Sequence, residues 1–211
     1  MSDKRALIII GAGGHASVLL DILLSQGQKV IAYISPEPAH NKRLFEGLIH
    51  LPNDRDINKY TSSEVLLVNG IGHMPKSELR SVIYNNFVKN GYQFTSVIAK
   101  SAIVSKYALI AKDAQVLTGA IIHAGASIGT NSIVNTSVIV EHDSEIRDHV
   151  HLAPNVTVCG NSVVGSKCFI GASATIIQDI VIGQQSVLGA GVTILQSINH
   201  NEIISPKRNL K

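Results

Sequence analysis

The sequence predicts an α/β N-terminal domain followed by an all-β domain whose short parallel strands wind into a β-helix. Two observations predict this order. At residues 6–26 an apolar run, a glycine-rich loop and a helical pattern follow one another, as at the start of an α/β unit. From Ile98 to Ile194 every sixth residue is aliphatic. We expect the first domain over residues 1–95 and the second over residues 96–211, since 211 residues suffice for two modest domains.

The N-terminal domain is expected to begin with a buried strand over residues 6–10, the apolar run Ala-Leu-Ile-Ile-Ile. The loop Gly11-Ala12-Gly13-Gly14-His15 follows, and then a helix over residues 16–26 that ends at Gly27. A glycine loop that leads into a helix offers backbone N–H groups to a phosphate. The domain is therefore expected to be Rossmann-like. Its further elements are expected to be strands over residues 30–34 and 65–68 and an amphipathic helix over residues 76–90.

The pattern Gly11-x-Gly13-x-x-Ala16 formally matches the dinucleotide fingerprint. Two features disfavour a nicotinamide cofactor. About 95 residues cannot hold a full six-stranded dinucleotide fold, and the second strand ends in Ser35-Pro36-Glu37 without a clean acidic residue for a ribose. A phosphate site for a nucleotide or nucleotide sugar fits this loop better, and a purely structural glycine turn remains an alternative.

The six-residue repeat is the strongest feature of the sequence. If aliphatic residues filled a third of all positions at random, a run of this length would have odds of about one in 10⁸. A smaller or β-branched residue, from Ala102 to Ile198, stands four residues after each aliphatic one. The repeated aliphatic positions are Ile98, Val104, Ile110, Val116, Ile122, Ile128, Val134, Val140, Ile146, Leu152, Val158, Val164, Ile170, Ile176, Ile182, Leu188 and Ile194.

A strict period of six fits neither a helix, which repeats every 3.6 residues, nor a free strand, which repeats every two. It is typical of a parallel β-helix, in which short strands are separated by tight corners. Three six-residue units make one triangular coil of 18 residues, so the run predicts about 5.7 coils. Glycine follows several of the aliphatic residues, and we expect it to supply backbone angles that a corner needs. These glycines are Gly129, Gly165, Gly171, Gly183 and Gly189.

Composition and charge exclude several classes of function. The formal net charge is +3 with the basic residues scattered, which argues against a nucleic-acid partner. No apolar stretch approaches the roughly 20 residues of a membrane span, and Leu7–Ile10 is too short for the core of a signal peptide. We therefore expect no membrane association and a cytoplasmic location. Cys159 and Cys168 fit no zinc spacing and are expected to be small buried residues, so no metal site is predicted.

Three parts of the sequence carry a specific resemblance: the loop Gly11–His15, the stretch Asn135–Asp143, and His151 together with Gly160-Asn161. With the repeat, they make the chain resemble the hexapeptide-repeat acyltransferases over nearly its whole length. The branch concerned contains bacterial nucleotide-aminosugar N-acetyltransferases and sialic-acid O-acetyltransferase-like proteins. The resemblance implies a left-handed β-helix that binds acetyl-CoA, an N-terminal domain that binds a nucleotide-linked amino sugar, a homotrimer, and no metal cofactor.

The same resemblance implies roles for individual residues. His142 would be the general base, and Asp143 would hold or polarise it. A base of near-neutral pKa suits acyl transfer from a thioester, which also needs a hydrogen-bond donor for the developing oxyanion. His151 would donate to the thioester carbonyl. The remaining implied contacts are Gly11, Gly13, Gly14, His15 and Asn135 to the substrate, and Gly160, Ala172 and Ala190 to the pantetheine arm of the coenzyme.

The 18-residue coil adds a geometric inference. Gly160 should stack directly on His142, with Ala124 on the other side, so the histidine would project between two small side chains. His151 is nine residues from His142, half a coil away, and should lie on another part of the prism. We therefore expect the active site to form between subunits, with His142 from one chain and His151 from its neighbour.

The function expected from the resemblance is N-acetylation of a nucleotide-linked 4-amino-4,6-dideoxy sugar for O-antigen or glycan biosynthesis. A dTDP sugar is favoured over a UDP or GDP sugar. Two departures from the family pattern leave contacts open. Residues 33–37 read Tyr-Ile-Ser-Pro-Glu where many members carry acidic residues that meet the nucleotide, and the tail at residues 204–211 differs from the usual one. The alternatives are O-acetylation of sialic acid or another sugar, a non-catalytic β-helix binding protein, and a nicotinamide oxidoreductase.

Overall fold

A computed structural model describes residues 5–40 and 42–206 of the chain. The chain divides into two compact units. The N-terminal unit comprises residues 1–73 and 77–97, and the β-helix unit comprises residues 74–76 and 98–211. The predicted fold class, a Rossmann-like α/β domain followed by an all-β left-handed parallel β-helix, is confirmed. Residues 207–211, at the end of the unusual tail, lie outside the described residues.

The N-terminal unit is built on a parallel sheet of four strands in the order β3-β2-β1-β4. Strand β3 and two short 3₁₀ helices were not expected from the sequence. Helix α2 begins later than predicted, because Lys76 has a φ of 61° and so lies outside the helical region. The elements are β1 (Ala6–Ile10), α1 (Gly14–Ser25), β2 (Val30–Ile34), η1 (Arg43–Phe45), β3 (Ile49–Leu51), η2 (Asp54–Lys59), β4 (Val65–Asn69) and α2 (Leu79–Lys89).

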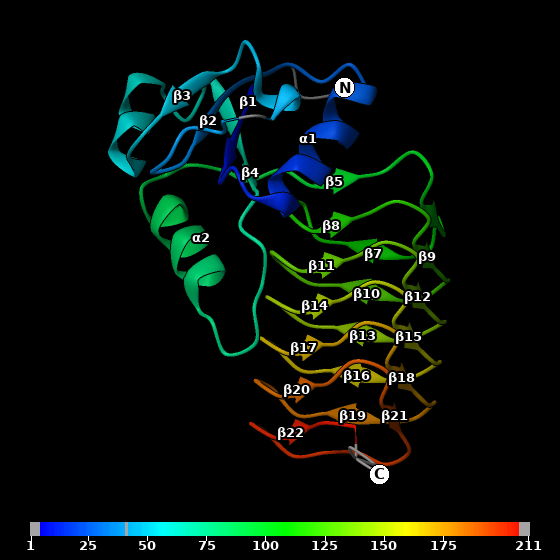
Figure 1. Ribbon diagram of the computed structural model, residues 1–211. Helices are drawn as coiled ribbons and strands as arrows, with labels where there is room; N and C mark the ends of the chain where they lie inside the picture. Colours follow the sequence, from blue (N-terminus) through cyan, green and yellow to red (C-terminus); the bar gives the residue numbers. More distant parts are fainter. Residues whose placement is uncertain (1–4, 41, 207–211) are drawn as a thin grey trace. The chain divides into compact units, whose positions relative to one another are not determined.

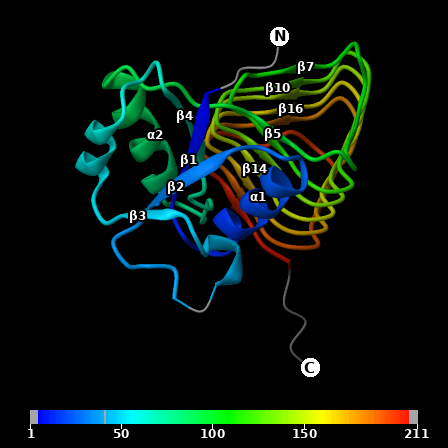
Figure 2. The same cartoon turned by 90° about the horizontal axis from the view of Figure 1, so that it is seen from above.

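Alternate residues of the strands face opposite sides of this sheet, and each side is covered by one helix (Figures 1 and 2). Ile8 and Ile10 of β1 belong to the cluster that contains Phe87 of α2. Helix α1 packs on β1 and β2 and buries Leu19, Leu20 and Leu23. The carboxyl ends of the parallel strands, and the loops that follow them, therefore lie at one edge of the sheet.

The β-helix unit consists of two-residue strands that form three parallel sheets (Figure 1). We call these sheets face 1, face 2 and face 3 in the order in which the chain visits them. Face 1 contains β5 (Val97–Ile98), β8 (Gln115–Val116), β11 (Ile133–Val134), β14 (His151–Leu152), β17 (Phe169–Ile170), β20 (Val187–Leu188) and β22 (Ile203–Ile204). Face 2 contains β6 (Ile103–Val104), β9 (Ile121–Ile122), β12 (Ile139–Val140), β15 (Thr157–Val158), β18 (Thr175–Ile176) and β21 (Thr193–Ile194). Face 3 contains β7 (Leu109–Ile110), β10 (Ser127–Ile128), β13 (Glu145–Ile146), β16 (Val163–Val164) and β19 (Val181–Ile182).

The predicted coil of 18 residues is confirmed by the strand register. Ile128 pairs with Ile110 on one side and with Ile146 on the other, so each aliphatic residue stacks on its equivalents in the adjacent coils. The repeated aliphatic residues from Val116 to Ile194 form one continuous buried core. The last coil is shorter: Ile198 pairs with Ile182, sixteen residues away, and so takes a strand position on face 3 instead of the inner corner position expected for it.

Serine fills four of the inner corner positions that lie four residues after an aliphatic one, and apolar residues or Cys168 fill the others. Ser132, Ser144 and Ser162 are at most 1% exposed, and each hydroxyl donates to a carbonyl fifteen residues ahead, at 2.7 to 3.0 Å. Cys168 occupies the same kind of position, and burial raises the pKa of its thiol to about 11. Cys159 is only half-buried, so the expectation that both cysteines are buried was wrong for it.

The glycines that follow the aliphatic residues do not have the role expected of them. Their backbone angles are ordinary, but a Cβ at Gly171 would lie 2.5 Å from the Ala190 nitrogen, and one at Gly165 would lie 2.6 Å from the Gln184 nitrogen. Glycine is needed there because adjacent coils approach too closely for a side chain. The left-handed conformation instead recurs three residues after each aliphatic position from Val116 to Leu188, at Gly119, Gly125, Asn131, Ser137, Asp143, His149, Asn155, Asn161, Lys167, Ser173, Asp179, Gln185 and Gly191.

Candidate active site

His142 and Asp143 form a hydrogen-bonded pair at the corner between β12 on face 2 and β13 on face 3. The His142 Nδ1 atom lies 2.9 Å from Oδ2 of Asp143, and both side chains are 64% exposed. An ionised carboxylate can only accept, so Nδ1 carries the proton in this pair and Nε2 of the neutral ring is left as a base. Asp143 reaches the ring from a left-handed backbone conformation, with φ of 58°.

Two glycines in the adjacent coils make room for this pair. A Cβ at Gly160 would lie 2.6 Å from Nε2 and 2.7 Å from Cε1 of His142. A Cβ at Gly125 would lie 2.1 Å from Oδ1 of Asp143. Gly160 was predicted from the stacking of coils, whereas Gly125 was missed although it stands one coil before Asp143. The imidazole and the carboxylate each lie over a residue that has no side chain.

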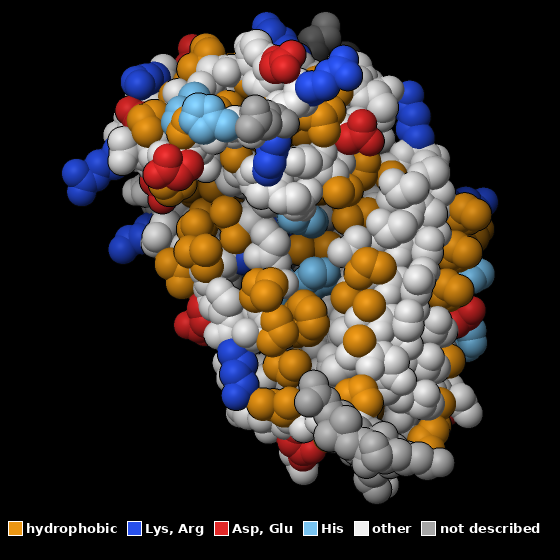
Figure 3. Space-filling view, in the orientation of Figure 1, with side chains coloured by type: hydrophobic (Ala, Val, Ile, Leu, Met, Phe, Trp, Pro, Cys, Tyr) orange, Lys and Arg blue, Asp and Glu red, His pale blue; other side chains and the backbone are white. Residues whose placement is uncertain are grey.

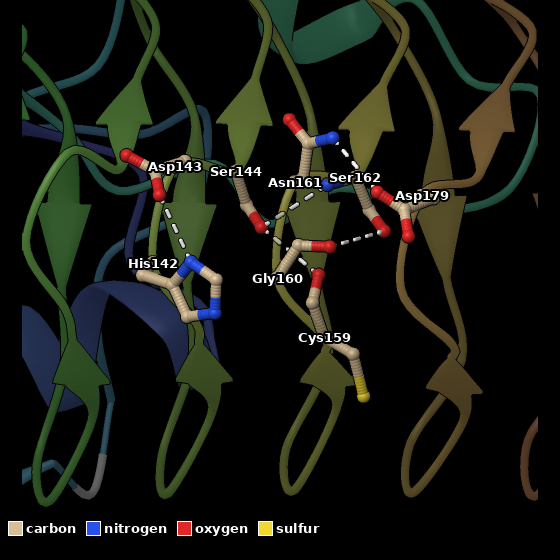
Figure 4. A network of polar contacts seen from close by, with 8 residues as sticks. All are labelled: His142, Asp143, Ser144, Cys159, Gly160, Asn161, Ser162 and Asp179. Atoms are coloured by element: carbon tan, nitrogen blue, oxygen red, sulfur yellow. Dashed lines mark hydrogen bonds and ion pairs between the residues drawn. The ribbon is translucent and has the colours of Figure 1, made fainter.

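The corner that carries the pair is held by hydrogen bonds between coils; Figure 4 shows the pair itself and the contact of Asn161 with Asp179. The Asp143 nitrogen donates to the carbonyl of Ala124 at 3.1 Å, and the Asn161 nitrogen donates to the carbonyl of His142 at 3.0 Å. The Asn161 side chain donates in turn to Asp179 at 2.8 Å. Both backbone contacts are made by the peptide group between His142 and Asp143, one to each adjacent coil, so the coils fix the backbone that carries the pair.

A second polar cluster lies on face 1 and contains two of the predicted site residues. Nδ2 of Asn135 lies 3.2 Å from Nε2 of His151, and the His151 ring packs edge-on against Phe169 at 5.1 Å. The Thr136 nitrogen donates to Oδ1 of Asn135 at 2.7 Å, which fixes the orientation of the amide. The amide nitrogen therefore donates to Nε2 of His151, and the neutral imidazole carries its proton on Nδ1. His151 itself is buried, at 9% exposed.

Within one chain the two clusters are separate. Asn135 follows β11 at the corner between faces 1 and 2, His151 belongs to β14 on face 1, and His142 follows β12 at the next corner. The structure thus brings Asn135 together with His151 rather than with His142. Ala172 and Ala190 lie farther along the corner that carries Asn135, where the Gly191 nitrogen donates to the carbonyl of Ala172 at 2.8 Å.

In the N-terminal unit, the predicted substrate loop precedes helix α1 at the carboxyl edge of the sheet. Gly13 is the N-cap of α1, and Gly14 and His15 belong to its first turn, which contains no acidic residue. A Cβ at Gly13 or Gly14 would meet nothing within 4 Å, whereas Gly11 has a φ of 95° and lies against the loop that follows β4. The Lys42 ammonium donates to the carbonyl of Ala12. The positive end of the helix dipole and this ammonium favour an anion at the loop.

Neither a metal cluster nor a membrane-spanning helix is found in the part of the chain that the structure describes. Among the described residues no group of three or more His, Cys, Asp and Glu side chains is arranged to hold a metal ion. No helix in residues 5–40 or 42–206 is long and apolar enough to cross a membrane.

Two family models match the chain. The model of the PglD N-terminal domain matches residues 6–87, and the model of the bacterial transferase hexapeptide (six repeats) matches residues 161–196. No curated protein sequence matches the chain. The matches cover parts of both units, and they agree with the glycine loop and the six-residue repeat on which the resemblance depends.

Solved structures are similar over nearly the whole chain. Perosamine N-acetyltransferase from Caulobacter crescentus, solved as a histidine variant with CoA and GDP-perosamine, is 25% identical, with a TM-score of 0.85 over 96% of this chain and 94% of that one. The acetyltransferase domain of PglB from Neisseria gonorrhoeae, solved with acetyl coenzyme A, is 24% identical, with a TM-score of 0.87 over 96% of both chains. WeeI from Acinetobacter baumannii is 19% identical, with a TM-score of 0.83 over 97% of this chain and 98% of that one. The resemblance to the hexapeptide-repeat acyltransferases is confirmed.

Proposed function

We propose that the chain, which is an acyltransferase of the hexapeptide-repeat class, transfers the acetyl group of acetyl-CoA to the amino group of a nucleotide-linked 4-amino-4,6-dideoxy sugar. The reaction would serve O-antigen or glycan biosynthesis in the cytoplasm. Support comes from perosamine N-acetyltransferase, which is similar over 96% of this chain and was solved with CoA and GDP-perosamine. The observation in this chain that carries the proposal is the His142–Asp143 pair, whose Nε2 lies over Gly160.

In the proposed reaction His142 is the general base. The sugar nitrogen attacks the thioester carbonyl carbon, and Nε2 takes a proton from that nitrogen as the C–N bond forms. The tetrahedral intermediate then collapses, the C–S bond breaks, and the imidazolium returns the proton to the sulfur of coenzyme A. Asp143 accepts from Nδ1 throughout, so it holds the ring orientation and stabilises the imidazolium.

His151 is proposed to donate from Nδ1 to the thioester oxygen, where negative charge develops. Asn135 would fix this tautomer by donating to Nε2. Ala172 and Ala190 would line the pantetheine arm. Because His142 and His151 lie on different parts of the prism, we propose that each active site combines His142 of one chain with His151 of its neighbour in a homotrimer.

The surface of the β-helix unit supports an assembly. Large aliphatic side chains stand exposed at outward strand positions, among them Ile103 at 65%, Leu109 at 72% and Val181 at 48%. On the side shown in Figure 3, charged side chains gather mainly on the N-terminal unit and are sparse along the β-helix. Exposed apolar side chains of this kind are typical of surfaces that other chains cover.

The diphosphate of the sugar nucleotide is proposed to bind at Gly11, Gly13, Gly14 and His15, at the N-terminus of α1. The base is proposed to be thymine, as favoured from the sequence, although the related structures with a named nucleotide sugar contain GDP-perosamine. The test must therefore include dTDP, UDP and GDP sugars as equals.

The experiment is release of free thiol from acetyl-CoA in the presence of dTDP-, UDP- and GDP-linked 4-amino-4,6-dideoxy sugars. Each amino sugar is paired with the matched sugar that carries a hydroxyl at the same carbon. Turnover with an amino sugar and none with its hydroxyl partner is expected. Turnover with the hydroxyl sugars alone would contradict the proposal in favour of O-acetylation, and no turnover with any sugar would favour a non-catalytic protein.

Mixing of inactive variants tests the shared site. His142→Ala and His151→Ala chains are unfolded together, refolded as mixed oligomers and assayed. If each site takes one histidine from each of two chains, about a quarter of the sites in an equal mixture recover both histidines. Activity near that fraction is expected. Mixtures as inactive as either variant alone would place both histidines in one chain, and the separately refolded variants serve as the control.

A further inference from the structure

Helix α2 contributes an arginine to the interior of the N-terminal unit. Arg80 is 3% exposed, although the apolar side chains Leu79 and Val82 of the same helix are exposed. A guanidinium is almost never fully buried unless its N–H groups are held by acceptors, since its desolvation is costly. The contacts of Arg80 therefore indicate which part of the N-terminal unit its buried guanidinium stabilises.

The guanidinium binds the backbone of the loop that follows β4. Its Nη1 donates to the carbonyl of Asn69 at 2.9 Å and to the carbonyl of Ile71 at 2.5 Å. Asn69, itself 2% exposed, donates from Nδ2 to the carbonyl of Arg80 at 3.3 Å and accepts from the Ile71 nitrogen at 3.2 Å. Arg80 and Asn69 thus hold the backbone at both ends of the segment 69–71.

This loop lies directly against the predicted substrate loop. A Cβ at Gly70 would lie 2.6 Å from the carbonyl oxygen of Ile10 and 2.8 Å from Cβ of Ala16. A Cβ at Gly11 would lie 2.9 Å from Cδ1 of Ile71. On the far side, a Cβ at Gly72 would lie 3.6 Å from Cβ of His15. Any shift of residues 69–72 is therefore transmitted to the start of α1.

We propose that Arg80 is a positioning residue for the nucleotide-sugar end of the active site. Through residues 69–72 it sets the position of Gly11 and His15, without touching the substrate. The inference rests on the proposed function, because it assigns the nucleotide sugar to the loop before α1. One nitrogen, Nη1, donates to both carbonyls, and the guanidinium plane fixes the directions of its two N–H bonds, whereas the N–H bonds of an ammonium rotate freely.

Steady-state kinetics of Arg80→Met and Arg80→Lys test this role. Arg80→Met is expected to raise KM for the nucleotide sugar about tenfold, while KM for acetyl-CoA stays within twofold. Arg80→Lys is expected to recover part of the loss. Arg5→Met is the matched control, because Arg5 also donates to a backbone carbonyl, that of Ser62 at 3.1 Å, but just before β1, at the opposite edge of the sheet. Its KM values are expected to equal those of the wild type.

Hydrogen exchange of the backbone amides separates this inference from the proposed function. Faster exchange at residues 11–15 and 70–72 in Arg80→Lys, with an unchanged melting temperature, supports the positioning role even if the wild type acetylates no sugar. Unchanged exchange and an unchanged KM in Arg80→Lys would overturn it. An equal rise of both KM values, or loss of the folded N-terminal unit in both variants, would also overturn it, since Arg80 would then serve folding alone.

Discussion

Replacing His142 by alanine is expected to lower kcat for sugar acetylation by about 10²–10⁴-fold, the range that general-base catalysis contributes. The reason is the position of Nε2, which is the unprotonated nitrogen of the His142–Asp143 pair. Binding of acetyl-CoA should be unchanged, because the proposed coenzyme contacts His151, Ala172 and Ala190 lie on face 1 or at the corner that follows it. The measurements are kcat by thiol release and the dissociation constant of acetyl-CoA by calorimetry.

His123→Ala is the matched control for this prediction. His123 is 49% exposed and lies one coil earlier on the same side of the prism, where it pairs with Glu141 at 3.7 Å. It should keep kcat within about twofold, as expected for an exposed pair. Equal losses in the two variants would contradict a specific role for His142. A His142→Ala enzyme that remains fully active would also contradict a specific role for His142.

Replacing Gly160 by alanine is expected to lower kcat by about 10²-fold, because small displacements of a catalytic group have effects of that size. The added methyl group would lie 2.6 Å from Nε2 and must push the imidazole aside. The fold should tolerate the change, since Ala124 occupies the equivalent position at the same corner two coils earlier. The melting temperature and both KM values are measured together with kcat.

This variant also distinguishes two roles for Gly160. The family resemblance assigns it to the pantetheine arm, whereas the structure places it against the His142 ring. A rise in KM for acetyl-CoA with kcat intact would favour the coenzyme role and contradict the one derived from the structure. Gln178→Ala is the control, because Gln178 is exposed at the equivalent position in the next coil. It shows whether any substitution at this corner position changes kcat or KM, and it should behave like the wild type.

The architecture of the β-helix could be predicted because one physical requirement repeats. Each coil must place an aliphatic side chain over those of its neighbours, so the period of six is visible directly in the sequence. The pairing of Ile128 with Ile110 and Ile146 follows from it. The shortened last coil could not be predicted, because Ile198 also satisfies the pattern of the uninterrupted repeat.

The glycines show where sequence patterns were insufficient. A glycine can be required because the backbone adopts a left-handed conformation or because another part of the chain approaches too closely for a side chain. The sequence does not distinguish these two reasons. Gly171 serves the approach of the next coil, whereas the left-handed position three residues after each aliphatic is mostly occupied by other residues, Asp143 among them. The sequence therefore predicted His142 and Asp143 as neighbours, but not the backbone conformation that turns the carboxylate toward the ring.

Contacts between residues distant in sequence were also missed. Asn135 and His151 were predicted as site residues, but their hydrogen bond depends on the angle between a corner and the strand of the next coil. Arg80 was not singled out within the amphipathic helix predicted over residues 76–90. Only the packing of α2 on the sheet shows that the guanidinium is buried and holds the loop after β4.

Identification of the product tests the central claim most directly. Wild-type protein is incubated with acetyl-CoA and the best amino-sugar nucleotide from the panel, and the product is analysed by mass spectrometry and NMR. The proposed function predicts one acetyl group per sugar, on the amino nitrogen, and no product with His142→Ala. An acetyl group on a sugar hydroxyl, or coenzyme A release without an acetylated sugar, would contradict it.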